Sequence, residues 1–152
     1  MKKLFVLMLT GILFSVAANA QEEESSQGYK DAVGVRLSSS TPAVSSGISY
    51  KHFFGNNAVE GILSFNNGGA LCALYEIHKP LNVANLQWLI GFGGYVGFGK
   101  TSNLGAAGIV GLDYKFDQLP INVSLDWKPE LNIVSKVGFE ASGVGLSARF
   151  TF

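Results

Sequence analysis

Apolar and polar residues alternate along most of the chain beyond about residue 30, and the alternation is cleanest at the C-terminal end. In residues 143–152, one face of an extended chain carries Val144, Leu146, Ala148, Phe150 and Phe152, and the other carries Gly143, Gly145, Ser147, Arg149 and Thr151. A period of two residues places successive side chains on opposite faces of a strand. The segment is therefore predicted to be a half-apolar β-strand.

Seven further segments carry the same period. They are residues 33–38, 47–54, 59–65, 71–78, 88–98, 106–116 and 121–128. The segments between them, 39–46, 55–57, 66–69, 79–85, 99–103, 117–120 and 129–138, are rich in turn-forming residues. No helix is needed after the N-terminal region. The pattern predicts an all-β chain that forms an eight-stranded antiparallel up-and-down barrel.

The first twenty residues have the features of a secretory signal peptide. Lys2 and Lys3 precede an apolar stretch at 4–16, and Ala18-Asn19-Ala20 provides the small residues that signal peptidase accepts. We therefore expect a signal peptide at 1–20, followed by a solvated tail at 21–28 and the barrel domain at 29–152; the charges and the resemblance described below lead us to expect that the tail is periplasmic and the barrel transmembrane.

Composition narrows the class of protein further. Hydrophobic residues make up 47% of the chain and charged residues 14%, which is too apolar for disorder. The 11 basic and 11 acidic residues are scattered, so no nucleic-acid partner is expected. The single cysteine, Cys72, is expected to point inward as a small buried thiol, and it excludes an internal disulfide. No cofactor or metal site is predicted.

The placement of charges decides which face of the barrel points outward. The polar face carries Arg36, Lys51, Lys115, Lys128 and Arg149 together with Glu60, Glu76, Asp113 and Asp126. This near balance suits a paired polar network in a closed lumen, since eight strands leave just enough room for inner side chains. On the apolar face, aromatic residues fall near strand ends: Phe54, Trp88, Phe116 and Phe152 at one rim, and Phe65, Phe98 and Trp127 at the other. Two such girdles are typical of membrane barrels.

The signal peptide, the eight alternating segments and the ending Ala148-Arg149-Phe150-Thr151-Phe152 resemble the small outer-membrane β-barrel proteins of Gram-negative bacteria, the OmpA/OmpX-like class. The resemblance implies location in the outer membrane and contact with outer-membrane lipid. It also implies that Phe150 and Phe152 form the signal read by the barrel assembly machinery. With an even strand number and a periplasmic tail, the loops after strands one, three, five and seven face outward.

Two motifs with possible chemistry compete with this interpretation. Residues 94–101 fit the phosphate-loop pattern, but that loop must be followed by a helix, and the residues after it again alternate as a strand does. His52 and His78 are candidate catalytic bases, yet no nucleophile or orienting acid can be placed beside them from sequence. Both are expected at interfacial strand ends, and no catalytic residue is assigned.

The sequence thus predicts an integral outer-membrane barrel, monomeric and non-enzymatic, with a structural or surface-interaction role and a closed charged lumen. Two alternatives stay open. A soluble lipocalin-like barrel would place its apolar face around a small apolar ligand. An outer-membrane lipid-modifying enzyme would depend on His52 or His78.

Overall fold

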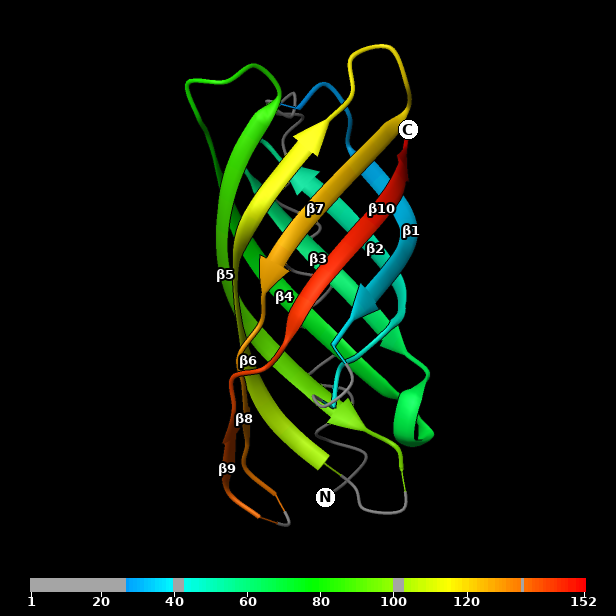
Figure 1. Cartoon of the computed structure of the whole chain (residues 1–152), viewed down its shortest axis with the longest axis vertical. Helices are drawn as coiled ribbons and strands as arrows, with labels where there is room; N and C mark the ends of the chain where they lie inside the picture. The colour runs from blue at the N-terminus through cyan, green and yellow to red at the C-terminus, as the bar shows by residue number, and fades with distance from the viewer. Residues whose placement is uncertain (1–26, 40–42, 100–102, 135) are drawn as a thin grey trace.

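The computed structural model describes residues 27–39, 43–99, 103–134 and 136–152 (Figure 1). Its elements are β1 (Asp31–Ser38), β2 (Gly47–Phe54), β3 (Asn57–Ser64), the short 3-10 helix η1 (Asn66–Gly68), β4 (Ala70–Pro80), β5 (Leu86–Gly97), β6 (Asn103–Lys115), β7 (Ile121–Trp127), β8 (Glu130–Asn132), β9 (Gly138–Glu140) and β10 (Val144–Thr151). Within these ranges, no helix is long and apolar enough to cross a bilayer.

The long strands close into a barrel. Each strand from β1 to β7 pairs antiparallel with the next, and β10 pairs with both β7 and β1. Figure 1 shows the tilted strands wrapping around one axis. All eight predicted strands are present, so the expected eight-stranded antiparallel barrel is confirmed.

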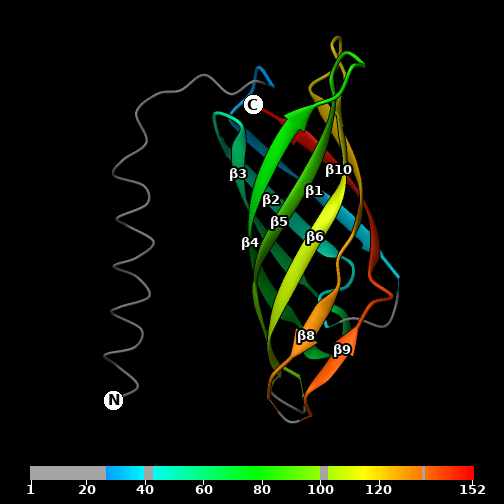
Figure 2. The ribbon, with the colours of Figure 1, turned by 90° about the vertical axis from the view of Figure 1, so that its left-hand side faces the viewer.

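The two ends of the barrel differ. At one end the start of β1 meets the C-terminal residue, because the amide of Asp31 donates to the carbonyl of Phe152 and the amide of Phe152 donates back to the carbonyl of Asp31. We call this the terminal end. At the opposite end lie η1, the β1–β2 loop and the β8–β9 hairpin (Figure 2), and we call it the η1 end.

The strands β8 and β9 correct the expectation that residues 129–138 form a loop. β6 is 13 residues long and β7 only 7, so part of β6 would lack a partner on that side. β8 pairs there, with Glu130 opposite Ala107, and β9 pairs with β8. The chain after Pro129 therefore continues the antiparallel pairing along β6.

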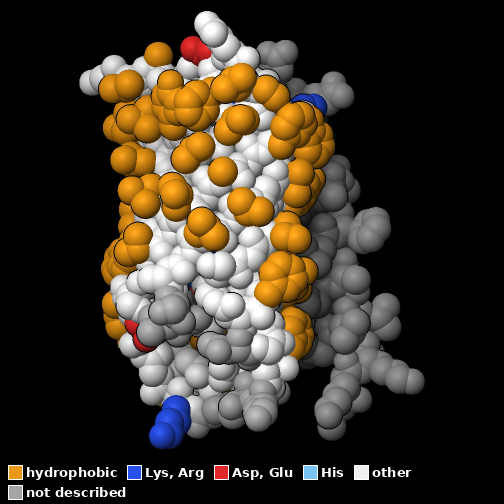
Figure 3. Space-filling view, turned by 45° about the vertical axis from the view of Figure 1, so that its right-hand side comes forward, with side chains coloured by type: hydrophobic (Ala, Val, Ile, Leu, Met, Phe, Trp, Pro, Cys, Tyr) orange, Lys and Arg blue, Asp and Glu red, His pale blue; other side chains and the backbone are white. Residues whose placement is uncertain are grey.

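Apolar side chains cover the outside of the barrel, and the inside holds polar and charged side chains together with an apolar cluster that includes Ile62, Leu74 and Leu89. Along β10, exposed and buried residues alternate without a break, with Leu146 and Phe150 exposed and Ser147 and Arg149 buried. Figure 3 shows hydrophobic side chains spread over the strands, while charged side chains are visible only toward the ends. Both aromatic girdles lie at the predicted strand ends: Phe65, Phe98 and Trp127 at the η1 end, and Phe54, Trp88, Phe116 and Phe152 at the terminal end.

Glycines on the two faces have different roles, which leads to a first prediction. A Cβ on Gly93 would overlap the carbonyl oxygen of Ala73 on the neighbouring strand, whereas a Cβ on the outward-facing Gly61 would meet nothing within 4 Å. We expect Gly93→Ala to lower the free energy of unfolding by about 1–3 kcal/mol because the strands must shift. Gly61→Ala should leave it unchanged or raise it by about 0.4–1 kcal/mol. Urea titration of the barrel in lipid vesicles measures both, and equal losses would contradict the assignment of faces.

Candidate functional site

Many charged side chains lie in the barrel interior, beside the buried apolar cluster. Eight of the nine residues named from the sequence lie there, each no more than 3% exposed: Arg36, Lys51, Glu60, Glu76, Asp113, Asp126, Lys128 and Arg149. They alternate along their strands with the apolar residues of the outer face, so the same period that covers the outside directs the charges inward. The interior is therefore the first candidate site.

Arg149, on β10, forms the centre of one polar cluster. Its Nε donates to the Ser49 hydroxyl at 2.7 Å, one terminal nitrogen donates to Ser124 at 2.8 Å and to Asn122 at 3.2 Å, and the other pairs with Glu60. A guanidinium offers five donors in a fixed plane. Arg149 therefore joins β10 to β2, β3 and β7 across the barrel.

Lys51 lies next to this cluster and is surrounded by carboxylates. Its Nζ lies 2.8 Å from Glu76, 3.3 Å from Asp113 and 3.8 Å from Glu60. His78 contacts the same Glu76 oxygen through Nε2 at 2.9 Å. A buried ammonium held by several acceptors compensates for its lost hydration through these contacts.

A third group lies nearer the η1 end. Arg36 and Asp126 form a two-pronged pair, with both nitrogen–oxygen distances at 2.6 Å. Lys128 pairs with Glu130, whose carboxylate also accepts the backbone N–H groups of Ala43 at 2.9 Å and Val44 at 3.2 Å. Glu130 thus fastens the β1–β2 loop to the barrel wall.

Aromatic side chains pack together at the terminal end of the interior. Tyr29, just before β1, packs edge-on against Phe53, and Phe53 packs in the same way against His78, with ring centres 5.2 and 4.8 Å apart. Burial raises the pKa of Tyr29. All three side chains in this stack are buried.

Two expectations need correction, and one interior residue was missed. Lys115 does not join the interior network: as the last residue of β6, it reaches along the rim, and its Nζ donates to the carbonyls of Phe116 at 2.6 Å and Leu119 at 2.8 Å. His78 is inside the barrel rather than at an interface, whereas His52 is half-buried at the rim and contacts Asp31 at 2.6 Å. Sequence reasoning missed Glu130 because it fell in a segment taken as loop.

The part of the barrel interior that the structure describes contains more buried carboxylates than buried cations. The described buried charges are four cations, Arg36, Lys51, Lys128 and Arg149, against five carboxylates, Glu60, Glu76, Asp113, Asp126 and Glu130. Glu60 pairs with Arg149, whereas the lysine or arginine paired with Glu76 is Lys51, which it shares with Glu60 and Asp113. Glu76→Gln should change the free energy of unfolding by less than about 1 kcal/mol, whereas Glu60→Gln should cost about 2–3 kcal/mol because it leaves Arg149 unpaired. Urea unfolding in lipid vesicles measures the free energy of unfolding of both variants. A larger loss of stability for Glu76→Gln than for Glu60→Gln would contradict the excess of buried carboxylates over cations.

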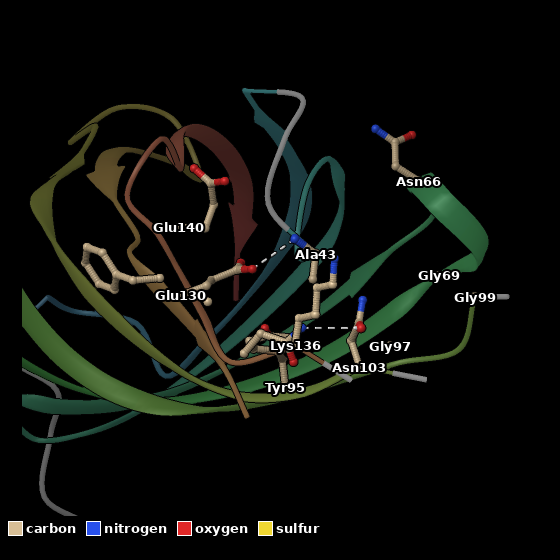
Figure 4. A pocket seen from close by; sticks show the side chains of 13 residues that line it. Ala43, Asn66, Gly69, Tyr95, Gly97, Gly99, Asn103, Glu130, Lys136 and Glu140 are labelled. Carbon is tan, nitrogen blue, oxygen red and sulfur yellow. Dashed lines mark hydrogen bonds between the residues drawn. The ribbon is translucent and has the colours of Figure 1, made fainter. Parts of the chain in front are cut away.

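A pocket of about 300 Å³ opens at the η1 end, above Glu130 (Figure 4). We call it the mouth pocket. Its lining residues are Ala43, Asn66, Gly69, Tyr95, Gly97, Gly99, Asn103, Glu130, Asn132, Lys136, Gly138, Phe139 and Glu140. Figure 4 shows Glu130 pointing to Ala43 and Glu140 lying on the same side of the pocket, with Lys136 beside Asn103. The mouth pocket is the second candidate site.

Other chemistry receives little support from the described residues. Among them, no three His, Cys, Asp or Glu side chains are grouped to hold a metal ion. Of the phosphate-loop pattern at 94–101, residues 94–97 belong to β5, and 100 and 101 lie outside the described residues. The next described element is the strand β6, where a phosphate loop requires a helix.

Comparison with known proteins identifies the fold. No model of a protein family matches the sequence, and no curated protein matches it. Among solved structures, the chain is similar to the N-terminal β-barrel domain of Pseudomonas aeruginosa OprF, with a TM-score of 0.60 and 13% sequence identity over 82% of this chain and 98% of that one. The chain therefore has the fold of the small OmpA-like eight-stranded β-barrels.

Proposed function

We propose that the chain is an integral β-barrel protein of the bacterial outer membrane. The observation that carries this proposal is the distribution of side chains: apolar residues are exposed around the barrel between two aromatic girdles, and charges are buried within it. In water this arrangement would leave a large apolar surface exposed, whereas in a bilayer the same surface faces lipid. Outer-membrane lipid is therefore the first partner.

The contents of the barrel interior favour a non-enzymatic protein that does not let solutes diffuse through its lumen. Charged side chains occupy the space between the strands, the Tyr29–Phe53 stack covers one end, and Val44 with Glu130 covers the other. Porins that pass solutes freely need about 16 strands to leave a water-filled channel. We infer a closed charged lumen and a structural or surface-interaction role for a monomeric barrel.

Neither alternative from the sequence is favoured. A lipocalin-like binder would turn its polar face to water and its apolar face to the ligand, whereas here the exposed face is apolar and the described interior holds ion pairs beside a packed apolar cluster. A lipid-modifying enzyme would need a histidine beside a nucleophile. His78 instead contacts Glu76 inside the barrel, and His52 shares Asp31 with the Tyr50 hydroxyl.

Export and assembly are part of the proposal. The signal peptide at 1–20 lies outside the described residues, and its removal would leave the tail in the periplasm, at the terminal end. Phe150 and Phe152 project from the outer surface there, 54% and 62% exposed, with their rings stacked 6.3 Å apart. Their exposure suits recognition by the barrel assembly machinery. The η1 end then faces the outside of the cell.

Fractionation of cells that express the chain tests this proposal. The protein should be recovered with the outer membrane, and its band should migrate differently in gel electrophoresis before and after boiling, because a closed barrel resists detergent unfolding. Recovery as a detergent-free soluble protein would overturn the proposal. An outer-membrane band without a heat shift would overturn the closed barrel.

A further inference from the structure

The residues that form the mouth pocket are held in place by packing and hydrogen bonds to neighbouring residues. Tyr95 on β5 is 4% exposed, and its ring lies where a Cβ on Gly105 of β6 would be, so only glycine at 105 leaves room for the ring. Aromatic rings commonly cover a glycine on the neighbouring strand in this way. The Glu130 carboxylate, fixed by Lys128 and the β1–β2 loop, closes the bottom. The pocket is therefore a preformed cavity that borders the interior network at Glu130.

Neutral polar groups dominate its inner wall. Asn132 accepts the amide N–H of Val134 at 3.3 Å and donates over a long 3.5 Å to Asn103. The second N–H of Asn132 and the amide N–H groups of Asn103 remain for a ligand. The Tyr95 hydroxyl has no hydrogen bond to the other described residues. Glu130 uses three of about four acceptor positions, which leaves one for a donor in the pocket.

The charged side chains that line the pocket are arranged to favour a neutral ligand over a charged one. Lys128 already neutralises Glu130. Glu140 lies at the rim, where the hydroxyl and amide of Ser142 donate to its carboxylate and lower its pKa, and Lys136 is exposed. An ammonium or carboxylate that entered would lose its hydration without a buried counter-charge. A neutral ligand with several hydroxyl groups meets no such penalty.

We propose that the mouth pocket binds one neutral pyranose residue. Its volume of about 300 Å³ is at the lower limit for ligand pockets and suits a single sugar ring. The amides of Asn103 and Asn132, the Tyr95 hydroxyl and the spare acceptor of Glu130 bind its hydroxyl groups. That the pocket faces the outside of the cell rests on the proposed function. Sugar binding does not, because it can be measured on the purified barrel.

Saturation-transfer NMR on the barrel in nanodiscs, titrated with glucose, galactose and mannose in turn, tests the proposal. At least one sugar should bind saturably, with a dissociation constant of about 1–10 mM for so small a ligand. Asn103→Ala and Asn132→Ala should each weaken it about three- to tenfold. Asn56→Ala, in the β2–β3 turn at the opposite end, should leave it unchanged and serves as the matched control.

A second variant blocks the cavity without removing a polar group. Gly138 pairs with Asn132, so a side chain there points into the pocket, and its Cβ would meet only the Lys136 carbonyl at 3.8 Å. Gly138→Leu should abolish sugar binding while the heat shift of the barrel persists. Binding that survives Gly138→Leu, or no saturable binding by the wild-type barrel, would overturn the proposal.

Two further titrations distinguish free sugar from glycan chain ends and neutral ligands from zwitterionic ones. An oligosaccharide that ends in the preferred residue should bind at least as tightly if glycan chain ends are the ligand, and not at all if only free sugar fits. Glycine and alanine provide zwitterionic probes. Tighter binding of these amino acids than of any sugar would overturn the assignment to a neutral ligand, and the outer-membrane proposal would stand regardless.

Discussion

Replacing Arg36 by methionine is expected to destabilise the barrel by about 3–5 kcal/mol, the largest effect of any single substitution considered. Arg36 makes two 2.6 Å contacts with Asp126, and both side chains are almost wholly buried. Removing one partner leaves the other charge buried without compensation, which costs far more than the pair itself contributes. The free energy of unfolding, measured by urea titration in lipid vesicles, gives the loss directly.

The double variant Arg36→Met with Asp126→Leu is the matched control. It removes both charges and replaces them with apolar side chains of similar length, so most of the lost stability should return. A double variant as unstable as the sum of the two single variants would show that the pair acts independently, which contradicts a mutual buried ion pair.

Val35→Arg should lower the free energy of unfolding by about 2–4 kcal/mol, because it adds a charge to the apolar outer face. Val35 lies near the middle of β1, is 57% exposed on the outer face, and pairs with Ala148 and Ile48 on the neighbouring strands. In a bilayer this position is near the midplane, where an arginine side chain loses most of its hydration. The same unfolding titration in vesicles measures the cost.

Val35→Leu controls for the change in shape, because it keeps the position apolar and should alter the free energy of unfolding by less than about 0.5 kcal/mol. If Val35→Arg were tolerated as well as Val35→Leu, the outer face would not be in contact with lipid.

The fold was predictable because alternation of apolar and polar residues is a local feature of the sequence. Alternation along a strand needs only neighbouring residues, and eight such segments with short turns between them leave few ways to pair except as a closed barrel. The same period directed Arg36, Lys51 and Arg149 inward, so most of the interior residues could also be named.

What could not be predicted depends on contacts between distant segments. The strands β8 and β9 form because β6 is longer than β7, and this difference becomes visible only when the strands are paired. Glu130 joins the interior through them, whereas Lys115 leaves it because a long side chain at a strand end can reach the turn carbonyls. The mouth pocket likewise combines residues from five separate segments, and no spacing in the sequence marks them.

The most direct test of lipid contact uses the two native tryptophans. Trp88 lies in the girdle at the terminal end, and Trp127, 42% exposed, lies in the girdle at the η1 end. In vesicles that contain brominated lipids, bromine near the headgroup end of the acyl chain should quench the tryptophan fluorescence strongly, and bromine at the chain end more weakly. Aqueous iodide should quench little. Fluorescence quenched by iodide but unaffected by any brominated lipid would contradict a membrane-spanning barrel with its apolar face outward.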